Sequence, residues 1–263
     1  MKFSVSVVII SHNSSKFIHK AFTSIINQTI NINKVVIVDD KSEDLESLKN
    51  VILHFQKVSK IKFELITNSN NYGPGYSRNL GWSKCETDFI AFLDDDDFWH
   101  KDKLKIQMEI LNNNKDIVLL ACRKSLNFDL NIKKCPSHKL FKINFYKLIF
   151  KNFIPTSGVI IKNDIKERFL HDYHAEDYFL WLSVTKRYNL SYFIDINLCK
   201  ELIVNKVKLT SDLNNLYKST YNVLGFFYND SFINNFLINS AKFSYLLKKY
   251  LKNNILIKKK YVS

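Results

Sequence analysis

Three short apolar runs in this chain are each followed at once by polar or acidic residues. They are Val5–Ile10, Lys34–Val38 and Phe89–Leu93. Runs of this length, rich in β-branched side chains, are typical of strands buried on both faces. Apolar residues at helical spacing follow the first two runs, from Phe17 to Gln28 and from Leu45 to about Lys57. The sequence therefore predicts an α/β fold with a mostly parallel central sheet flanked by helices.

The ends of these strands carry the polar residues. Ser11-His12-Asn13 follows the first run, Asp39-Asp40 the second and Asp94–Asp97 the third. Ligands of parallel α/β sheets bind beyond the carboxyl ends of the strands. We expect the three ends to meet at one edge and to form a site for a cation and a nucleotide.

Four consecutive carboxylates, Asp94–Asp97, give the strongest chemical signal. Adjacent like charges repel and lose hydration when partly buried, so folding alone does not favour them. A divalent cation does, because Mg²⁺ and Mn²⁺ prefer hard oxygen ligands and bind diphosphates. The alternative is a solvated acidic turn.

Glycine is concentrated in one segment, Asn71–Gly81, which holds three of the five glycines. A glycine-rich turn before a helix brings backbone N–H groups close to a phosphate, and Arg78 adds a charged fork. The alternative is that a helix packed tightly against the sheet needs glycine there.

Charge and cysteine content limit the class of protein. With 39 basic and 25 acidic residues the net charge is +14, which suits anionic partners or a lysine-rich solubilising surface. Four scattered cysteines without a Cys-x-x-Cys pair fit a reducing cytoplasm. We expect a cytoplasmic protein with no secretory signal, and no apolar run reaches the roughly 18–20 residues that span a bilayer.

The second half contains a helix opening at His174, with Glu176 and Asp177 in its first turn. Carboxylates at that position usually complement the helix dipole. From about Asp212 the chain is predicted to be helical and aromatic, with Phe232, Phe236 and Phe243 in one stripe. Such a stripe indicates internal packing or, with its flanking lysines, a membrane surface.

Five segments, in this order, resemble motifs of the family 2 glycosyltransferases, which are inverting enzymes with a GT-A (Rossmann-like) fold. They are Val5–Asn13, Val36–Asp44, Asn71–Gly81, Phe92–Trp99 and Glu176–Leu182. The third is similar to the family's "N-x-G-x-x-x-A-R-N-x-G" stretch, the fourth to "F-L-D-x-D-D-x-W", which holds the D-x-D motif, and the fifth to "E-D-x-x-L-W-L". The resemblance covers residues 3–110 most closely and 150–205 less so.

The resemblance implies a nucleotide-sugar site. His12 takes the position of a tyrosine that packs on the base, Asp40 that of an aspartate that binds a pyrimidine, and Arg78 that of an arginine near the diphosphate. Asp94 and Asp96 match the D-x-D carboxylates, with Asp96 expected to bind Mn²⁺ or Mg²⁺ directly. The full nucleotide-sugar-binding set predicted here is Ser11, His12, Asp40, Gly75, Arg78, Asp94 and Asp95, with Asp95 expected to reach the ribose.

The resemblance also implies the catalytic group. Asp177 matches the base that removes the proton of the acceptor hydroxyl, and Glu176 is expected to orient the loop or the acceptor. Two positions depart from the family pattern. Lys41 replaces a glycine, so that turn is expected to differ. Lys206 and Lys208 stand where many relatives carry "R-x-H", which leaves the third metal ligand open.

These observations predict a metal-dependent glycosyltransferase that uses a nucleotide-sugar, with UDP as the expected nucleotide. The expected acceptor is a glycan on a lipid carrier, lipopolysaccharide or capsule, and the basic C-terminal segment is a candidate for contact with an anionic membrane. Residues 1–110 are predicted to bind the donor, 111–210 to bind the acceptor and supply the base, and 211–263 to form a helical extension. Two alternatives are a nucleotidyltransferase and a non-catalytic basic binding module, and we expect no nucleic-acid partner.

Overall fold

The computed structural model describes residues 2–128, 140–171, 175–202, 213–228, 232 and 235–247. The strands in this part of the chain are β1 Val5–Ser11, β2 Lys34–Asp39, β3 Lys62–Thr67, β4 Phe89–Asp94, β5 Asp97–Trp99, β6 Leu119–Ser125, β7 Leu140–Lys142, β8 Ile160–Lys162 and β9 Ser191–Glu201. The helices are α1 His19–Ile26, α2 Leu45–Val58, α3 Gly73–Ser83, α4 Lys103–Asn113, α5 Phe145–Phe150, α6 Glu176–Tyr188 and α7 Leu213–Gly225, with a 3₁₀ turn at Thr156–Gly158. Residues 235–247 are also helical.

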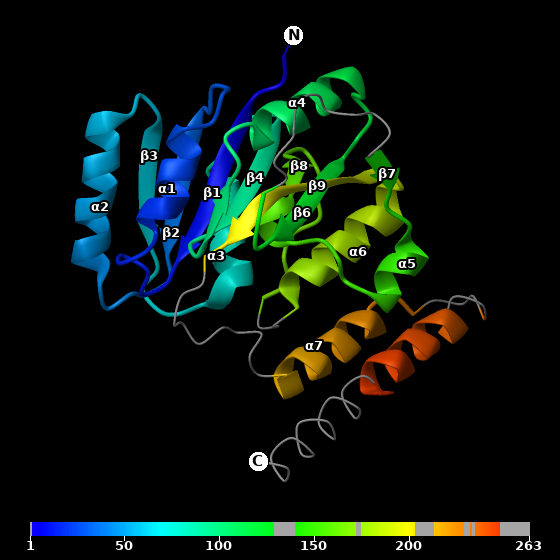
Figure 1. Cartoon of the computed structure of the whole chain (residues 1–263). Helices are drawn as coiled ribbons and strands as arrows, with labels where there is room; N and C mark the ends of the chain where they lie inside the picture. The colour runs from blue at the N-terminus through cyan, green and yellow to red at the C-terminus, as the bar shows by residue number, and fades with distance from the viewer. Residues whose placement is uncertain are drawn as a thin grey trace, which may run out of the picture.

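The described strands form one nine-stranded sheet, ordered β3-β2-β1-β4-β8-β6-β9-β5, with β7 paired to β9 (Figure 1). Strands β1 to β4 are parallel, as the sequence predicted. β8 pairs antiparallel with both β4 and β6, and β5 and β7 pair antiparallel with β9. The sheet is therefore parallel in its first half and mixed in its second. It is continuous across residue 110, and the proposed domain boundaries remain a prediction.

Alternate residues of the strands supply the two cores, one on each face of the sheet. Val7 and Ile9 of β1 pack with the apolar sides of α1, α2 and α4. Val8 of the same strand packs on the other face with α3, α5, α6 and α7. Burial on both faces explains why these strands read as continuous apolar runs rather than alternating ones. The α/β fold with helices on both faces is confirmed.

The C-terminal part adds a helical pair to the second face. Val223 and Leu224 of α7 and Ile238 and Ala241 of the helix 235–247 belong to the core beside α6. Figure 1 shows the two helices lying together below α5 and α6. Lys206 and Lys208 lie outside the described residues, as do all residues after 247. Within the ranges that are described, no helix is long and apolar enough to cross a membrane.

Candidate active site

The carboxyl ends of β1, β2 and β4 meet at one edge of the sheet. Ile10 pairs with Asp94, and Ser11 pairs with Asp39. The backbone N–H of His12 donates to Asp95 Oδ2 at 3.3 Å. The strand ends that the sequence predicted to converge therefore do so.

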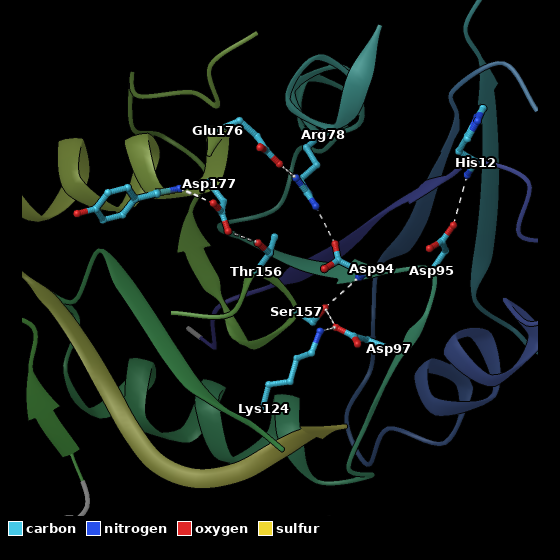
Figure 2. Close-up of polar contacts among 11 residues, drawn as sticks. His12, Arg78, Asp94, Asp95, Asp97, Lys124, Thr156, Ser157, Glu176 and Asp177 are labelled. Carbon is cyan, nitrogen blue, oxygen red and sulfur yellow. Dashed lines mark hydrogen bonds and ion pairs between the residues drawn. The ribbon is translucent and has the colours of Figure 1, made fainter. Parts of the chain in front are cut away.

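Arg78 joins this edge to α6. Its guanidinium donates through Nη2 to Asp94 Oδ1 at 2.8 Å and through Nη1 to Glu176 Oε1 at 2.7 Å, as Figure 2 shows. Arg78 and Glu176 are both buried. Burial raises the pKa of Asp94, but the charges of Arg78 and Lys124 outweigh it, so the pKa lies below its usual value. Asp94 is thus kept ionised, and Glu176 fixes the helix of the predicted base against the donor edge.

Asp97, the fourth carboxylate of the acidic run, faces inward and is almost fully buried. Its Oδ2 accepts from Lys124 Nζ at 2.6 Å and from Ser157 Oγ at 2.5 Å (Figure 2). Burial and the nearby charge of Asp94 raise its pKa to about 7. Asp97 is therefore a structural member of the site that holds Ser157 and Lys124 in place.

The 3₁₀ turn Thr156–Gly158 links the two acidic groups of the site. Ser157 Oγ accepts from the backbone N–H of Asp94 at 3.1 Å while it donates to Asp97. Its neighbour Thr156 donates through Oγ1 to Asp177 Oδ2 at 2.9 Å. Two adjacent hydroxyls thus position the donor edge and the predicted base. The sequence analysis missed them, and the adjacent hydroxyl pair after Pro155 was the available signal.

Asp177 lies at the start of α6, half-buried, with a pKa raised to about 7. Burial is the main cause, and the adjacent charge of Glu176 adds to it. Arg78, the hydroxyl of Thr156 and the backbone N–H of Tyr178 act in the opposite direction. A carboxyl group that titrates near neutral pH suits a general base, because proton transfer is most efficient when the pKa is close to the working pH.

Asp40 is buried and is occupied by protein donors. Its carboxylate accepts from Asn68 Nδ2 at 2.7 Å and from the backbone N–H groups of Tyr72 and Gly73 at 2.9 and 2.8 Å. It therefore stabilises the N-terminus of α3. A carboxylate has about four acceptor positions, so one remains for the predicted contact with a base.

Lys41, which follows Asp40, has a backbone conformation that is uncommon for lysine. Its φ of 63° lies in the left-handed region that glycine favours. Whether this turn differs from that of the relatives stays a prediction. The long side chain reaches the Ser69 carbonyl oxygen, to which Nζ donates at 2.7 Å.

Ser11, His12 and Gly75 are at the edge but make protein contacts. Ser11 Oγ lies 2.6 Å from Ser14 Oγ, and His12 Nδ1 donates to the Asp40 carbonyl oxygen at 2.9 Å. A Cβ on Gly75 would lie 1.9 Å from the Leu170 carbonyl oxygen, so close packing alone explains glycine there. Their contacts with a nucleotide remain predictions.

Asp94 and Asp96 are the candidate ligands of a divalent cation. Among the described residues, no three His, Cys, Asp or Glu side chains are grouped so that they hold a metal ion by themselves. A magnesium ion that binds with a diphosphate needs only one or two protein carboxylates, and the phosphates complete the shell. Asp96 is partly exposed, and only one oxygen of Asp94 is used by Arg78. The donor set fits such a cation.

The mixed sheet with this acidic edge is a GT-A type fold. The chain belongs to glycosyl transferase family 2, whose model matches residues 6–169. This membership favours a glycosyltransferase over the nucleotidyltransferase and the non-catalytic module.

Two curated relatives illustrate the similarity. The chain is 28% identical over 224 residues to the UDP-Glc:alpha-D-GlcNAc-diphosphoundecaprenol beta-1,3-glucosyltransferase WfgD of Escherichia coli, covering 85% of this chain and 86% of that protein. It is 34% identical over 129 residues to the poly(ribitol-phosphate) beta-N-acetylglucosaminyltransferase TarS of Staphylococcus aureus, covering 48% of this chain and 22% of that one.

Solved structures agree in fold. TarS 1–349 of S. aureus in complex with UDP-GlcNAc superposes with a TM-score of 0.65 at 19% identity, covering 84% of this chain and 66% of that one. The mannosyltransferase PcManGT of Pyrobaculum calidifontis, in complex with GDP-Man and Mn²⁺, gives 0.70 at 13% identity, covering 93% and 70%. At these identities the likeness shows the fold alone.

Proposed function

We propose that this protein is an inverting glycosyltransferase that moves a sugar from a UDP-sugar to a hydroxyl of a lipid-linked glycan in cell-surface polysaccharide synthesis. The observation that carries the proposal is the Glu176–Arg78–Asp94 contact. It holds Asp177, with its pKa of about 7, beside the acidic edge where a donor diphosphate would lie. A base and a diphosphate site held together by one buried arginine suit transfer to a hydroxyl group.

The chemistry follows from these positions. Asp177 accepts the proton of the acceptor hydroxyl. At the same time the oxygen of that hydroxyl forms a bond to the anomeric carbon of the donor sugar. The bond from that carbon to the nucleotide diphosphate breaks on the opposite face, and its electron pair leaves with the diphosphate. The configuration at the anomeric carbon is therefore inverted.

Asp94 and Asp96 would hold Mn²⁺ or Mg²⁺ together with the donor diphosphate. When bound, the cation offsets the negative charge that grows on the leaving diphosphate. Arg78 keeps Asp94 ionised and fixes the orientation of its carboxylate. Because Arg78 donates only to Oδ1, it leaves Oδ2 available to a cation.

The choice of donor and acceptor rests on the relatives. The name of WfgD gives UDP-Glc as its donor and a diphosphoundecaprenol-linked sugar as its acceptor. Its similarity to this chain extends over most of the length of both proteins. The TarS structure was solved with UDP-GlcNAc. The UDP donor is part of the proposal on these grounds, and the cation is part of it because the oxygens of Asp94 and Asp96 suit such an ion.

The test is a transfer assay with the full chain. UDP-Glc, UDP-Gal, UDP-GlcNAc and GDP-Man are each supplied with a short-chain lipid diphosphate that carries GlcNAc, with Mn²⁺ or with EDTA. We expect a disaccharide from a UDP-sugar with inverted anomeric configuration, read by NMR, and its loss in EDTA. Product only from GDP-Man would overturn the donor assignment, and retained configuration would overturn the mechanism. Release of a sugar 1-phosphate, with the nucleoside monophosphate moved to the acceptor, would indicate nucleotidyl transfer instead.

A further inference from the structure

Large apolar side chains are exposed together on the C-terminal helical pair. On the helix 235–247, Phe236 and Phe243 are 61% and 66% exposed, and Phe232 just before it is 83% exposed. Leu246 and Leu247 are also exposed. These five residues, which we term the aromatic face, lie at spacings that place Phe236, Phe243 and Leu247 on one side of a helix.

The opposite side of the same helix is buried, which fixes its orientation. Ile238 and Ala241 are fully buried against the core beside α6. Tyr228, which follows α7, donates through its hydroxyl to Asn239. The sequence analysis left packing or a membrane surface open for this stripe. For Phe236 and Phe243, internal packing is wrong, because the helix packs through its other side.

A pocket that contains the ammonium group of Lys242 lies between α7 and the helix 235–247. It has a volume of about 320 Å³ and is lined by Tyr221, Asn222, Gly225, Phe226 and Lys242. Lys242 is only 8% exposed, and its Nζ lies 4.3 and 4.4 Å from the ring centroids of Tyr221 and Tyr228. The tyrosine rings and Phe226 are themselves substantially exposed. A lysine ammonium beside exposed aromatic rings is chemistry suited to an anionic head group at an apolar boundary.

Positive charge is concentrated in the same part of the sequence. Residues 213–263 contain eight lysines and a single acidic residue, Asp230, so this fifth of the chain carries +7 of the total net charge of +14. A second copy of the chain would bring the same positive charge and would be repelled. An anionic surface would be attracted.

We propose that the aromatic face docks on an anionic phospholipid bilayer, with a head-group phosphate bound by Lys242 in its pocket. Phe232, Phe236 and Phe243 enter the boundary between head groups and acyl chains, and the net positive charge of residues 213–263 attracts the protein to the negative surface. The pairing of apolar rings with positive charge favours a bilayer over a neutral apolar partner.

Vesicle flotation of the full chain tests the proposal, with vesicles of phosphatidylcholine alone and with phosphatidylglycerol added. We expect binding to the anionic vesicles that weakens as salt rises. The triple variant Phe232→Ser, Phe236→Ser, Phe243→Ser should bind at least about tenfold more weakly, because apolar burial and charge contribute together. A matched triple variant, Leu53→Ser, Val58→Ser, Phe141→Ser, removes exposed apolar side chains elsewhere and should bind as the wild type does.

Lys242→Gln tests the pocket separately. It should reduce binding to phosphatidylglycerol vesicles and leave any residual binding to phosphatidylcholine unchanged. Absence of binding to anionic vesicles, or equal loss in both triple variants, would overturn the proposal. A wild-type dimer that the aromatic-face variant converts to a monomer, without vesicle binding, would show a second copy as the occupant and would also overturn it.

Transfer to a water-soluble acceptor separates this inference from the proposed function. The aromatic-face variant should retain wild-type turnover there, because its substitutions lie outside the active site. If the wild type bound vesicles but transferred no sugar, the function would fail and the docking surface would stand.

Discussion

The pKa values of two aspartates at the candidate active site are shifted in opposite directions. Asp94 ends β4, Asp177 lies in the first turn of α6, and the charge of Arg78 acts on both. At Asp94 the charges of Arg78 and Lys124 outweigh burial and lower the pKa. At Asp177 burial and the charge of Glu176 outweigh Arg78 and raise the pKa to about 7.

The difference suits the two roles that we propose for these aspartates. A carboxylate kept ionised by nearby positive charges suits binding of a metal ion and, through that ion, of a diphosphate. A carboxyl group that titrates near pH 7 suits accepting a proton and releasing it again. The neighbouring groups of each aspartate set its pKa. Arg78 forms an ion pair with Asp94 directly, and it is joined to the helix of Asp177 through its ion pair with Glu176.

Removing the base should have the largest effect. Asp177→Asn keeps the shape of the side chain but cannot take the acceptor proton, so turnover should fall by about 10²–10⁴-fold. Donor affinity, measured by calorimetry with a UDP-sugar and Mn²⁺, should stay close to that of the wild type. Turnover near the wild-type value would show that the base is another group.

A substitution at the predicted cation site should affect donor affinity, which the substitution of Asp177 is expected to leave unchanged. Asp96→Ala removes a predicted cation ligand, so donor affinity should fall by at least about tenfold and should no longer respond to Mn²⁺. The measurement is a titration of UDP-sugar with and without Mn²⁺. An unchanged dependence on the cation would remove Asp96 from the metal site.

The buried ion pair beside Asp94 should matter for folding. Lys124→Met leaves Asp97, which is 1% exposed, without its cation, so the free energy of unfolding should fall by about 1–3 kcal/mol. The neighbouring Arg123→Met breaks the exposed Arg123–Asp195 pair and should cost at most about 1 kcal/mol. Urea unfolding compares the two variants, and equal losses would argue against a structural role for the buried pair.

The sequence predicted the first half of the molecule better than the second. The run Lys34–Val38 became β2 with one residue more. The ends of the three strands lie side by side as expected, with Asp94 paired to Ile10 and Asp39 paired to Ser11. Those features depend on local patterns and on one topological rule. Ser157 and Lys124 were missed because only the tertiary fold brings them to Asp97, at sequence separations of 60 and 27 residues. The acidic run predicted a site, but not that Asp97 would turn inward.

The smallest predicted effect tests the hydroxyl that holds the base. Thr156 donates to Asp177 and thereby lowers the pKa of that carboxyl group. Thr156→Val should therefore raise this pKa above its value of about 7. Because the base works only when deprotonated, kcat/KM falls as the pH drops through the pKa, and this limb should move to higher pH.

The expected displacement is about one pH unit, since a hydrogen bond to a partly exposed charged group contributes about 1.5 kcal/mol and one unit corresponds to about 1.36 kcal/mol. Turnover at pH 7 should thus fall a few-fold, while that at pH 9 should match the wild type. Thr156→Ser restores the hydroxyl and should restore the profile. A lower plateau at every pH with an unmoved limb would mean that Thr156 only supports the fold of the turn, and the distinction between the two aspartates would then rest on burial and Glu176 alone.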